Sequence, residues 1–420
     1  MPQSSSDVTQ TARGLLQVNV VNIQNQYPVT DATVTIRAVA EAGQIPVQLR
    51  TNSSGQTEQI ALPAPPVDYS FDPDGGRPYS EYDITVSAPG FQTARIIGTE
   101  VLPGETAIQP VRLEPEDDPQ PLPDPIVIPE HTLYGEYPAK VAETEVQPVG
   151  ESGNIVLSRV VVPQTIVVHD GAPGASARDY YVSYRDYIKN VASSEIYATW
   201  PQATITANIL AIMSFTLNRV FTEHYRNRGY DFTITSSTAY DHKWIYGRNI
   251  YENISVTVDE IFDSYLARPG VRQLILTQYC DGRQVQCLQR GWMSQWGSFD
   301  LGERNYSPIE ILRYFYGESI YVNTAEEISG IPASWPGYDL TTGSSGQKVM
   351  QLQEQLDAIA AVYTSIPRIT ADGIYGGRTA DAVRAFQSIF GLPLSGVTDF
   401  PTWYKISHIY VGISGIGELN

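Results

Sequence analysis

The sequence is poor in cysteine and in basic residues. Only two of its 420 residues are cysteines, so no disulfide framework holds the fold together and hydrophobic cores must supply the stability. Lysine and arginine number 27 against 46 aspartates and glutamates, which leaves a formal net charge of -19. A surface this acidic repels phosphate backbones and anionic lipids. We therefore expect neither nucleic acid nor an anionic membrane as a partner.

Targeting signals and long apolar runs are also missing. The first residues, MPQSSSDVTQTARG, have neither the basic start nor the apolar stretch of a secretory signal. No apolar run approaches the roughly 20 residues that a helix needs to cross a bilayer. These absences predict a protein that has no membrane span and is made in a cytoplasm.

Several catalytic signatures are absent as well. The five histidines are scattered and form no HExxH pair, which argues against a zinc amidase or zinc peptidase. The sequence has no GxSxG elbow and no P-loop. Its cysteines, Cys280 and Cys287, lie close together without an evident histidine partner. What remains is carboxylate chemistry, with an aspartate or a glutamate as the reacting group.

The pattern of apolar residues divides the chain into four parts. Residues 1–114 alternate apolar and polar positions between turn-forming residues, as in Leu16, Val18 and Val20, and predict an all-β sandwich. Residues 115–150 are rich in proline and acid, so we expect an extended, solvated linker that proteases can reach. Residues 151–334 predict an α+β domain, and residues 335–420 carry amphipathic helical patterns.

The N-terminal part carries two turns of a known type. The turn Asn52-Ser53-Ser54-Gly55 and the strand end Ala88-Pro89-Gly90-Phe91 resemble carboxypeptidase regulatory-like, or prealbumin-type, domains. The resemblance implies a β-sandwich that serves as a binding or inhibitory module. A passive spacer is the alternative, because such sandwiches share no chemistry.

The C-terminal part has apolar residues at helical spacing in two runs, Val349 to Ile359 and Ala382 to Phe390. Between them lies the turn Asp372-Gly373-Ile374-Tyr375-Gly376, and Thr379 is a plausible N-cap of the second helix. With the later Thr402-Trp403 pair, this pattern resembles the three-helix peptidoglycan-binding domain. The resemblance implies that Tyr375 and Trp403 bind glycan, unless these two aromatics belong to the core.

One motif in the central part carries a glutamate in a distinctive setting. The run Val191-Ala192-Ser193-Ser194-Glu195-Ile196 leads into Ala198-Thr199-Trp200-Pro201 and a long helical pattern. This resembles the SpoIID family of peptidoglycan lytic transglycosylases, although two serines separate the alanine from the glutamate here. Matching segments follow in the family's order at Tyr246-Gly247, Tyr279 to Gly282, Met293 to Gly297 and Ile311 to Gly317. The resemblance implies that Glu195 is catalytic. The order of all four parts is similar to that of clostridial spore cortex-lytic enzymes.

The chemistry of Glu195 agrees with this resemblance. Its apolar neighbours favour a protonated carboxyl group, which a general acid needs in order to protonate the leaving oxygen of a glycosidic bond. A lytic transglycosylase needs one such acid, because the C6 hydroxyl of the muramic acid attacks and leaves a 1,6-anhydro end. A muramidase that uses water needs a second carboxylate, for which Asp241 is the first candidate. A non-catalytic wall-binding adaptor is the alternative outside enzymes.

Other site residues are expected around Glu195. Ser294 and Gln295 are candidates to hydrogen-bond the sugar, and Asp241 and Tyr246 are candidates to line the cleft, although each of the four also suits a structural role.

The two cysteines leave the metal question open. Cys280 and Cys287 fall near a position where some SpoIID relatives bind zinc, but the run from Gln286 to Gly291 lacks the family's histidine. A structural zinc ion, a short disulfide and two free thiols all remain open. The reaction itself requires no cofactor.

Together the motifs predict an enzyme that cuts peptidoglycan by lytic transglycosylation, and the resemblance implies that it acts on the spore cortex during germination. We expect it to be made in the mother cell, without a secretory signal, and to lie in the cortex and coat region of the spore. Because an enzyme stored beside its substrate must be held inactive, residues up to about 150 are predicted to be a pro-region. An activating protease would cut between Glu114 and Pro163.

Overall fold

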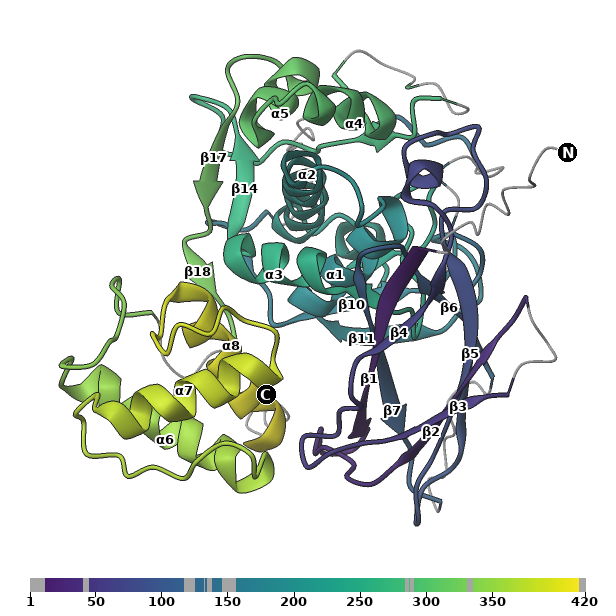
Figure 1. Cartoon of the computed structure of the whole chain (residues 1–420). Coiled ribbons are helices and arrows are strands. Elements are labelled where there is room, and N and C mark those ends of the chain that lie inside the picture. Colours follow the sequence, from purple (N-terminus) through teal and green to yellow (C-terminus); the bar gives the residue numbers. More distant parts are fainter. Residues whose placement is uncertain are drawn as a thin grey trace, which may run out of the picture.

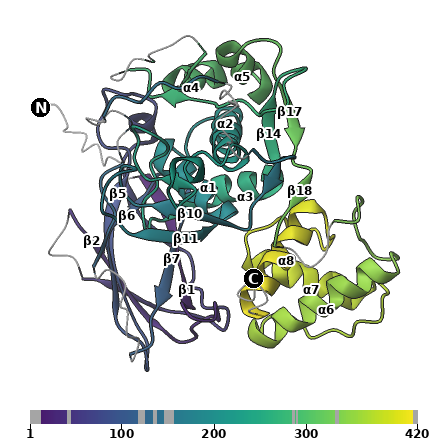
Figure 2. The ribbon, with the colours of Figure 1, turned by 180° about the vertical axis from the view of Figure 1, so that it is seen from behind.

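The computed structural model describes residues 12–40, 45–116, 125–131, 133, 138–145, 156–283, 287, 291–330 and 335–414. Its elements gather in three regions: the N-terminal sheets, a central region built around one long helix, and three C-terminal helices (Figure 1). Seen from either side, the central region lies above, while the sheets and the C-terminal helices lie next to each other below it (Figures 1 and 2). The chain is therefore a multidomain protein of mixed α and β structure.

The N-terminal region consists of strands whose burial alternates along the chain, as in Leu16, Val18 and Val20, which are all fully buried. One sheet has the order β13-β7-β1-β4 and the other β3-β2-β5-β6-β8, with β1 parallel to β7. A short 3-10 helix, η1 (Val67–Ser70), leads from the first sheet to the second. The strands of this region are β1 (Ala12–Asn22), β2 (Thr33–Ala38), β3 (Val47–Arg50), β4 (Ile60–Ala64), β5 (Ser80–Ser87), β6 (Ala94–Val101) and β7 (Thr106–Leu113).

Each of the two sheets is completed by a strand from further along the chain. From the predicted linker, β8 (Ile126–Val127) pairs with β6, and from the central region, β13 (Ile250–Tyr251) pairs with β7. Ile128 and His131, which follow β8, are buried. The linker was expected to be solvated throughout. Some of its described residues, such as Val127 and Val141, are exposed, but others pack on folded parts of the chain. The N-terminal sheets therefore do not form a detached module.

The central region is organised around α2 (Gln202–Phe221), which packs against α1, α3, α4, α5 and β14. This is the one helix, among the residues that the structure describes, with the length and composition to cross a membrane, and 89% of its apolar window is buried. Such burial is typical of the core helix of a domain. The other helices are α1 (Tyr184–Glu195), α3 (Glu252–Ile261), α4 (Gln295–Glu303), α5 (Pro308–Tyr316) and the 3-10 turn η2 (Arg226–Arg228).

Short strands surround these helices. The run Thr165-Ile166-Val167-Val168, whose β-branched residues are typical of a strand, lies in β10. The tetrapeptide Ser307-Pro308-Ile309-Glu310 has the sequence of a capping box, and it opens α5 as such. The strands are β9 (Val161–Val162), β10 (Thr165–His169), β11 (Asp179–Ser183), β12 (Ile234–Thr235), β14 (Ser264–Ala267), β15 (Tyr279–Cys280), β16 (Met293–Ser294), β17 (Tyr321–Thr324) and β18 (Glu327–Ile328).

The C-terminal region is formed by α6 (Gln347–Val362), α7 (Gly377–Ile389) and α8 (Phe400–Ser414). Two buried glutamines fix the loops between them: the side-chain oxygens of Gln353 and Gln387 accept hydrogen bonds from the backbone N–H groups of Gly373 and Gly396. The predicted N-cap of the second helix is wrong. Gly376 occupies that position, and Thr379 is buried inside the helix, where its hydroxyl accepts a hydrogen bond from Gln353.

Candidate functional site

Glu195 lies where α1 ends and the backbone turns toward α2. The helix begins at the N-cap Ser183, whose hydroxyl accepts a hydrogen bond from the Asp186 N–H, and it ends because Ile196 is extended, with φ of -140°. The Glu195 side chain is 8% exposed. A carboxyl group with so little exposure needs hydrogen-bond partners, and the surrounding loops provide them.

Two groups from distant parts of the chain hold the carboxyl group of Glu195. The backbone N–H of Lys243 donates to Oε1 at 2.8 Å, and the side-chain amide of Gln295 donates to Oε2 at 3.1 Å. The same amide nitrogen also donates to the Glu195 carbonyl oxygen at 2.9 Å. The carboxyl group is thus fixed in orientation by one loop and by the first residue of α4.

The loop that contains Lys243 is fastened to α1 itself. The side chain of Asn190 accepts a hydrogen bond from the backbone N–H of Ile245 and donates one to its carbonyl oxygen. Because Asn190 and Glu195 share one helix, the Lys243 N–H is held in register with the carboxyl group that it contacts.

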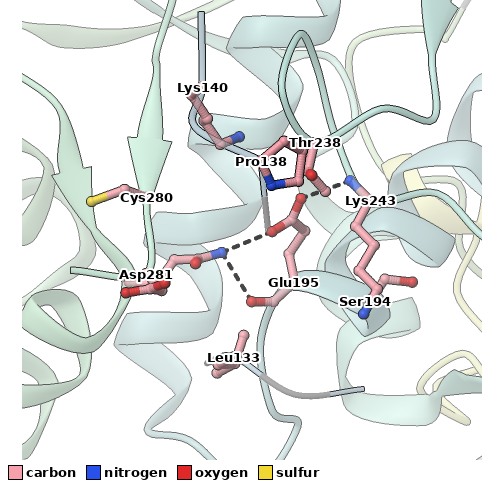
Figure 3. A pocket seen from close by; sticks show the side chains of 10 residues that line it. Leu133, Pro138, Lys140, Ser194, Glu195, Thr238, Lys243, Cys280 and Asp281 are labelled. Atoms are coloured by element: carbon pink, nitrogen blue, oxygen red, sulfur yellow. Dashed lines mark hydrogen bonds between the residues drawn. The ribbon is translucent and has the colours of Figure 1, made fainter. Parts of the chain in front are cut away.

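The space around Glu195 is a small pocket (Figure 3). Its volume is about 40 Å³, far below the roughly 300 Å³ at which ligand pockets begin. A glycan would have to widen it. The lining residues are Leu133, Pro138, Lys140, Ser194, Glu195, Thr238, Lys243, Cys280, Asp281 and Gln295.

Of the residues predicted to accompany Glu195, Gln295 is in the pocket, but it binds the glutamate rather than facing open space for a sugar. Its neighbour Ser294 is the N-cap of α4 and accepts a hydrogen bond from the Gly297 N–H at 2.9 Å. Ser294 therefore supports the helix that presents Gln295.

Asp241 lies outside the pocket, in contrast to the prediction of a cleft residue. It is 1% exposed, and its carboxylate accepts hydrogen bonds from Arg219 at 2.8 Å, from the Tyr225 hydroxyl at 2.5 Å and from Thr235 at 2.7 Å. A carboxylate with this many donors is part of a buried network. It is not free to activate a water molecule beside a sugar.

Tyr246 also lies away from Glu195. Its ring stacks on Tyr180 with centroids 4.5 Å apart, in a separate cavity between the central region and β7. Burial raises the pKa of Tyr246 to about 12. The sequence placed Tyr246 in the cleft because the Tyr246-Gly247 pair matches the SpoIID pattern, but the structure places its ring in this other cavity.

The two aromatics of the C-terminal region are core residues. Tyr375 is fully buried and its hydroxyl donates to the Gly396 carbonyl oxygen at 3.0 Å, while Trp403 is 1% exposed. Neither side chain reaches a surface where a glycan could stack on it. This corrects the prediction that they bind substrate.

Cys280 and Cys287 form a disulfide. Both sulfur atoms that a zinc ion would need are used in that bond. Among the residues that the structure describes, no group of three or more histidine, cysteine, aspartate or glutamate side chains is arranged to hold a metal ion. Of the alternatives left open by the sequence, the structure has the disulfide.

Sequence reasoning missed the three other charged residues of the pocket, which are Lys140, Lys243 and Asp281. Asp281 follows directly on β15 and brings a second carboxyl group to the pocket, in place of Asp241. It belongs to the Tyr279 to Gly282 stretch that matched the SpoIID pattern, which was the one available signal. Lys140 comes from the predicted linker, where nothing in the sequence pointed to a site.

Comparison with known proteins gives one family match. Residues 345–406 match the model of a putative peptidoglycan binding domain. No curated protein matches the chain. The match covers α6, α7 and the first half of α8, and it supports the peptidoglycan-binding domain predicted there.

Similar solved structures cover parts of the chain. The SleB N-terminal domain is 28% identical over 18% of this chain and 99% of that one, with a TM-score of 0.17. Hydroxyquinol 1,2-dioxygenase from Pseudomonas putida is 14% identical over 26% of this chain and 58% of that one, with a TM-score of 0.19. The 5-hydroxyisourate hydrolase from Klebsiella pneumoniae is 16% identical over 24% of this chain and 90% of that one, with a TM-score of 0.17. Likenesses with such low TM-scores carry no argument about function.

The family match and the fold agree on the C-terminal region. Its three helices, their buried glutamines and the matched residues 345–406 form one unit. The protein therefore has a cell-wall-related function and carries a C-terminal region of the peptidoglycan-binding type.

Proposed function

We propose that the protein cleaves the glycan strands of peptidoglycan, with Glu195 as the general acid. The observation that carries the proposal is the Glu195 pocket, in which one carboxyl group is held by Lys243 and Gln295 in a chain that also carries a peptidoglycan-binding region. Such a carboxyl group can protonate the leaving oxygen of a glycosidic bond.

The reaction that we propose is lytic transglycosylation. Glu195 gives its proton to the oxygen of the bond that breaks, and the sugar develops positive charge at its anomeric carbon. The same carboxylate then accepts the proton of the C6 hydroxyl of the muramic residue as that oxygen attacks. The product is a 1,6-anhydro end, and Glu195 finishes in its starting protonation state. Gln295 and the Lys243 N–H keep the two carboxyl oxygens in place through both steps.

Replacing Glu195 tests this role. Glu195→Gln keeps the shape of the side chain but has no proton to give, so we expect cleavage to fall by about 100- to 10,000-fold while wall binding stays unchanged. Glu303→Gln, an exposed acid at the end of α4, is the matched control and should keep full activity. If Glu195→Gln cleaves at the wild-type rate, another group is the acid. If neither the wild type nor the variant cleaves, the chain is a binding adaptor.

Hydrolysis by a muramidase is the second candidate, because Asp281 brings another carboxyl group into the pocket. Mass spectrometry of the reducing ends separates the two reactions, since transglycosylation leaves anhydro ends and hydrolysis does not. Asp281→Asn gives a second line of evidence. It should leave transglycosylation largely intact and should abolish cleavage by a hydrolase.

We further propose a spore cortex-lytic enzyme of the SleC type, stored as an inactive pro-form in the spore. The support lies in contacts of the N-terminal sheets with the segment after Glu195. The hydroxyl and the carbonyl oxygen of Ser70, at the end of η1, accept hydrogen bonds from Thr199 and from the indole of Trp200. Phe71 stacks on Phe299 with ring centroids 5.6 Å apart.

A buried ion pair joins the same two regions. Arg248 of the central region donates to Glu100 of β6 at 2.6 Å, and both side chains are at most 1% exposed. Burial alone would raise the pKa of Glu100, but the charge of Arg248, together with the hydrogen bond to His131, outweighs burial and lowers that pKa. This buried ion pair stabilises the contact between the N-terminal sheets and the central region.

The activating cut is proposed between Glu116 and Pro125. A cut there would break the covalent link to the N-terminal sheets while leaving residues 125–145 joined to the central region. For the sheets to leave, β8 and His131 would have to give up their contacts with β6. The test is to insert a specific protease site after Glu116 and to compare cortex release before and after cutting. A clear rise in rate supports the pro-form, whereas equal rates would leave the sheets as a spacer.

A further inference from the structure

A stretch of the predicted linker passes beside the Glu195 pocket. We name residues 138–145 the strap. Its backbone is bound on both sides: the Val141 N–H donates to the Ala239 carbonyl oxygen at 2.7 Å, and the Leu276 N–H donates to the Glu145 carbonyl oxygen at 3.1 Å. The side-chain amide of Gln278 donates to the Val141 carbonyl oxygen at 3.0 Å. The strap is therefore built into the central region.

Two acids of the strap pair with arginines of that region. Glu143 accepts from Arg219 at 2.6 Å, and Glu145 accepts from Arg268 at 2.5 Å and 2.8 Å. Arg219 is fully buried. Arg219 has two carboxylate partners, Glu143 and the buried Asp241, so losing the strap would remove one of the two. Removing a partner from a buried ion pair is destabilising. The strap must consequently stay with the central region after any activating cut, and its side chains belong to the working site.

Lys140 extends from the strap into the pocket and points its ammonium group toward Glu195 (Figure 3). The ammonium nitrogen donates to the backbone carbonyl oxygen of Asp241 at 3.1 Å and lies 4.4 Å from the centre of the Tyr279 ring. An ammonium group has three N–H donors, so these contacts leave donor capacity for a ligand.

Lys140 places a positive charge in the pocket of an otherwise acidic protein. Burial lowers the pKa of Lys140, whereas the negative charges of Glu195 and Asp241 oppose that change. The carboxylate of Asp241 is occupied by Arg219, and Glu195 is held by Gln295 and the Lys243 N–H. Within the described part of the chain, the hydrogen bond recorded for the Lys140 ammonium group goes to a neutral carbonyl oxygen. A half-buried cation of this kind favours an anionic ligand.

We propose that Lys140 binds a carboxylate of the substrate, on the sugar next to the bond that Glu195 cleaves. The proposal rests on the glycan-cleaving function given above. In peptidoglycan, the muramic residue carries a lactyl group, which ends in a free carboxylate wherever no peptide is attached. Lys140 thus makes the enzyme select muramic residues whose lactyl carboxylate is free. A residue of the predicted linker therefore takes part in substrate binding.

The test uses the full chain with the protease site after Glu116, cut before the assay. The substrates are a soluble glycan with free lactyl carboxylates and the same glycan after conversion of its carboxylates to methylamides. Lys140→Gln should raise KM for the free glycan by about 10- to 100-fold, since a charged hydrogen bond contributes an effect of that order. It should leave KM for the methylamide glycan unchanged, and Lys140→Arg should restore most of the affinity.

The outcomes separate the possibilities. An equal change for both glycans, or no change for either, overturns the proposal, and a lowered melting temperature in Lys140→Gln but not in Lys140→Arg assigns a structural role instead. If no glycan is cleaved by any form, the proposed function fails rather than this inference. Binding of the two glycans to the Glu195→Gln chain then decides, because a charge-dependent difference in Kd that Lys140→Gln removes supports the carboxylate site. No such difference refutes it.

Discussion

The C-terminal helices and the Glu195 pocket are stabilised by the same kind of bond, a buried glutamine side chain, but at very different chain separations. Gln353 reaches Gly373 across 20 positions, and Gln387 reaches Gly396 across 9. Gln295 reaches Glu195 across 100. The first arrangement depends on a local sequence pattern, whereas the second depends on the fold of the whole central region.

This difference separates binding from catalysis in the molecule. The C-terminal helices contain their own core and loops, so they can keep their shape when the rest of the chain changes. The pocket combines the strap, the end of α1, the loop at Lys243 and the start of α4. A change in any of these segments is expected to disturb Glu195.

The largest expected effect comes from separating the regions. A fragment of residues 335–414 should fold and bind peptidoglycan without cutting it. A fragment of residues 156–330 should fail to fold, because Arg248 loses its carboxylate partner Glu100 and Arg219 loses one of its two carboxylate partners, Glu143. Each broken buried pair costs about 3–5 kcal/mol, and a whole domain has about 5–15 kcal/mol of stability.

Circular dichroism and pull-down on purified peptidoglycan check both fragments. A cooperatively melting fragment 156–330 would show that the pocket region folds independently of its partners. A folded fragment 335–414 that stays in the supernatant would remove the targeting role of the C-terminal helices.

A matched pair of glutamine variants gives the next largest effect. Gln295→Ala should lower kcat by about 10- to 100-fold, since small misplacements of a catalytic group have effects of that order. Gln353→Ala should leave kcat on soluble glycan unchanged but destabilise the C-terminal helices by about 1–3 kcal/mol. Steady-state kinetics and thermal melts of both variants measure the contrast between a catalytic and a purely structural glutamine. If Gln295→Ala changes only KM, Gln295 has no effect on the catalytic step and this contrast is lost.

The stability of the contact between the N-terminal sheets and the central region should depend on pH through the protonation of His131. Burial, with a contribution from Arg248, lowers the pKa of His131 to about 4, below the value of about 6.5 in an unfolded chain. Between about pH 4 and pH 6.5, the unfolded chain therefore binds more protons at His131 than the folded chain does. The stability that neutral His131 contributes is fully present above about pH 6.5 and is lost as the pH falls toward 4. Melting temperatures between pH 4.5 and 7.5 should show this slope. His131→Asn should flatten it, and an unchanged slope in that variant would assign it to other groups.

The smallest effect is expected from the disulfide. Replacing Cys280 and Cys287 by serine opens a short loop, for which the loss of stability should be about 2 kcal/mol or less. A chelator should leave the melting temperature unchanged. A chelator-dependent drop would instead point to zinc bound by the reduced thiols.

The sequence predicted the parts of the site that depend on local patterns. Glu195 stands in a contiguous motif, and the capping box at Ser307 is a four-residue signal that the structure confirms. Lys140 and Asp281 could not be placed in the same way, because the composition of the linker predicts solvation and a single aspartate has no pattern. Their positions depend on distant partners, such as Arg219 for the strap.

The opposite error occurred with the aromatic residues. Tyr375 and Trp403 belong to a correctly predicted domain, but their rings fill its core, and the tyrosine hydroxyl finds its partner in the Gly396 carbonyl oxygen. A family pattern preserves core positions as readily as binding positions, so sequence spacing alone does not distinguish the two roles.

The pairing of β13 with β7 has a consequence for the order of events during synthesis. The N-terminal sheets leave the ribosome long before Ile250 and Tyr251, and domains generally fold in that order. The edge of β7, which has folded first, can then pair with β13. The backbone N–H of Tyr251 in β13 also donates a hydrogen bond to the Ser193 hydroxyl in α1. The N-terminal sheets would thus act as an intramolecular chaperone for the helix that ends at Glu195. A chain from which they are cut after folding would keep a shape that a chain made without them reaches slowly or not at all.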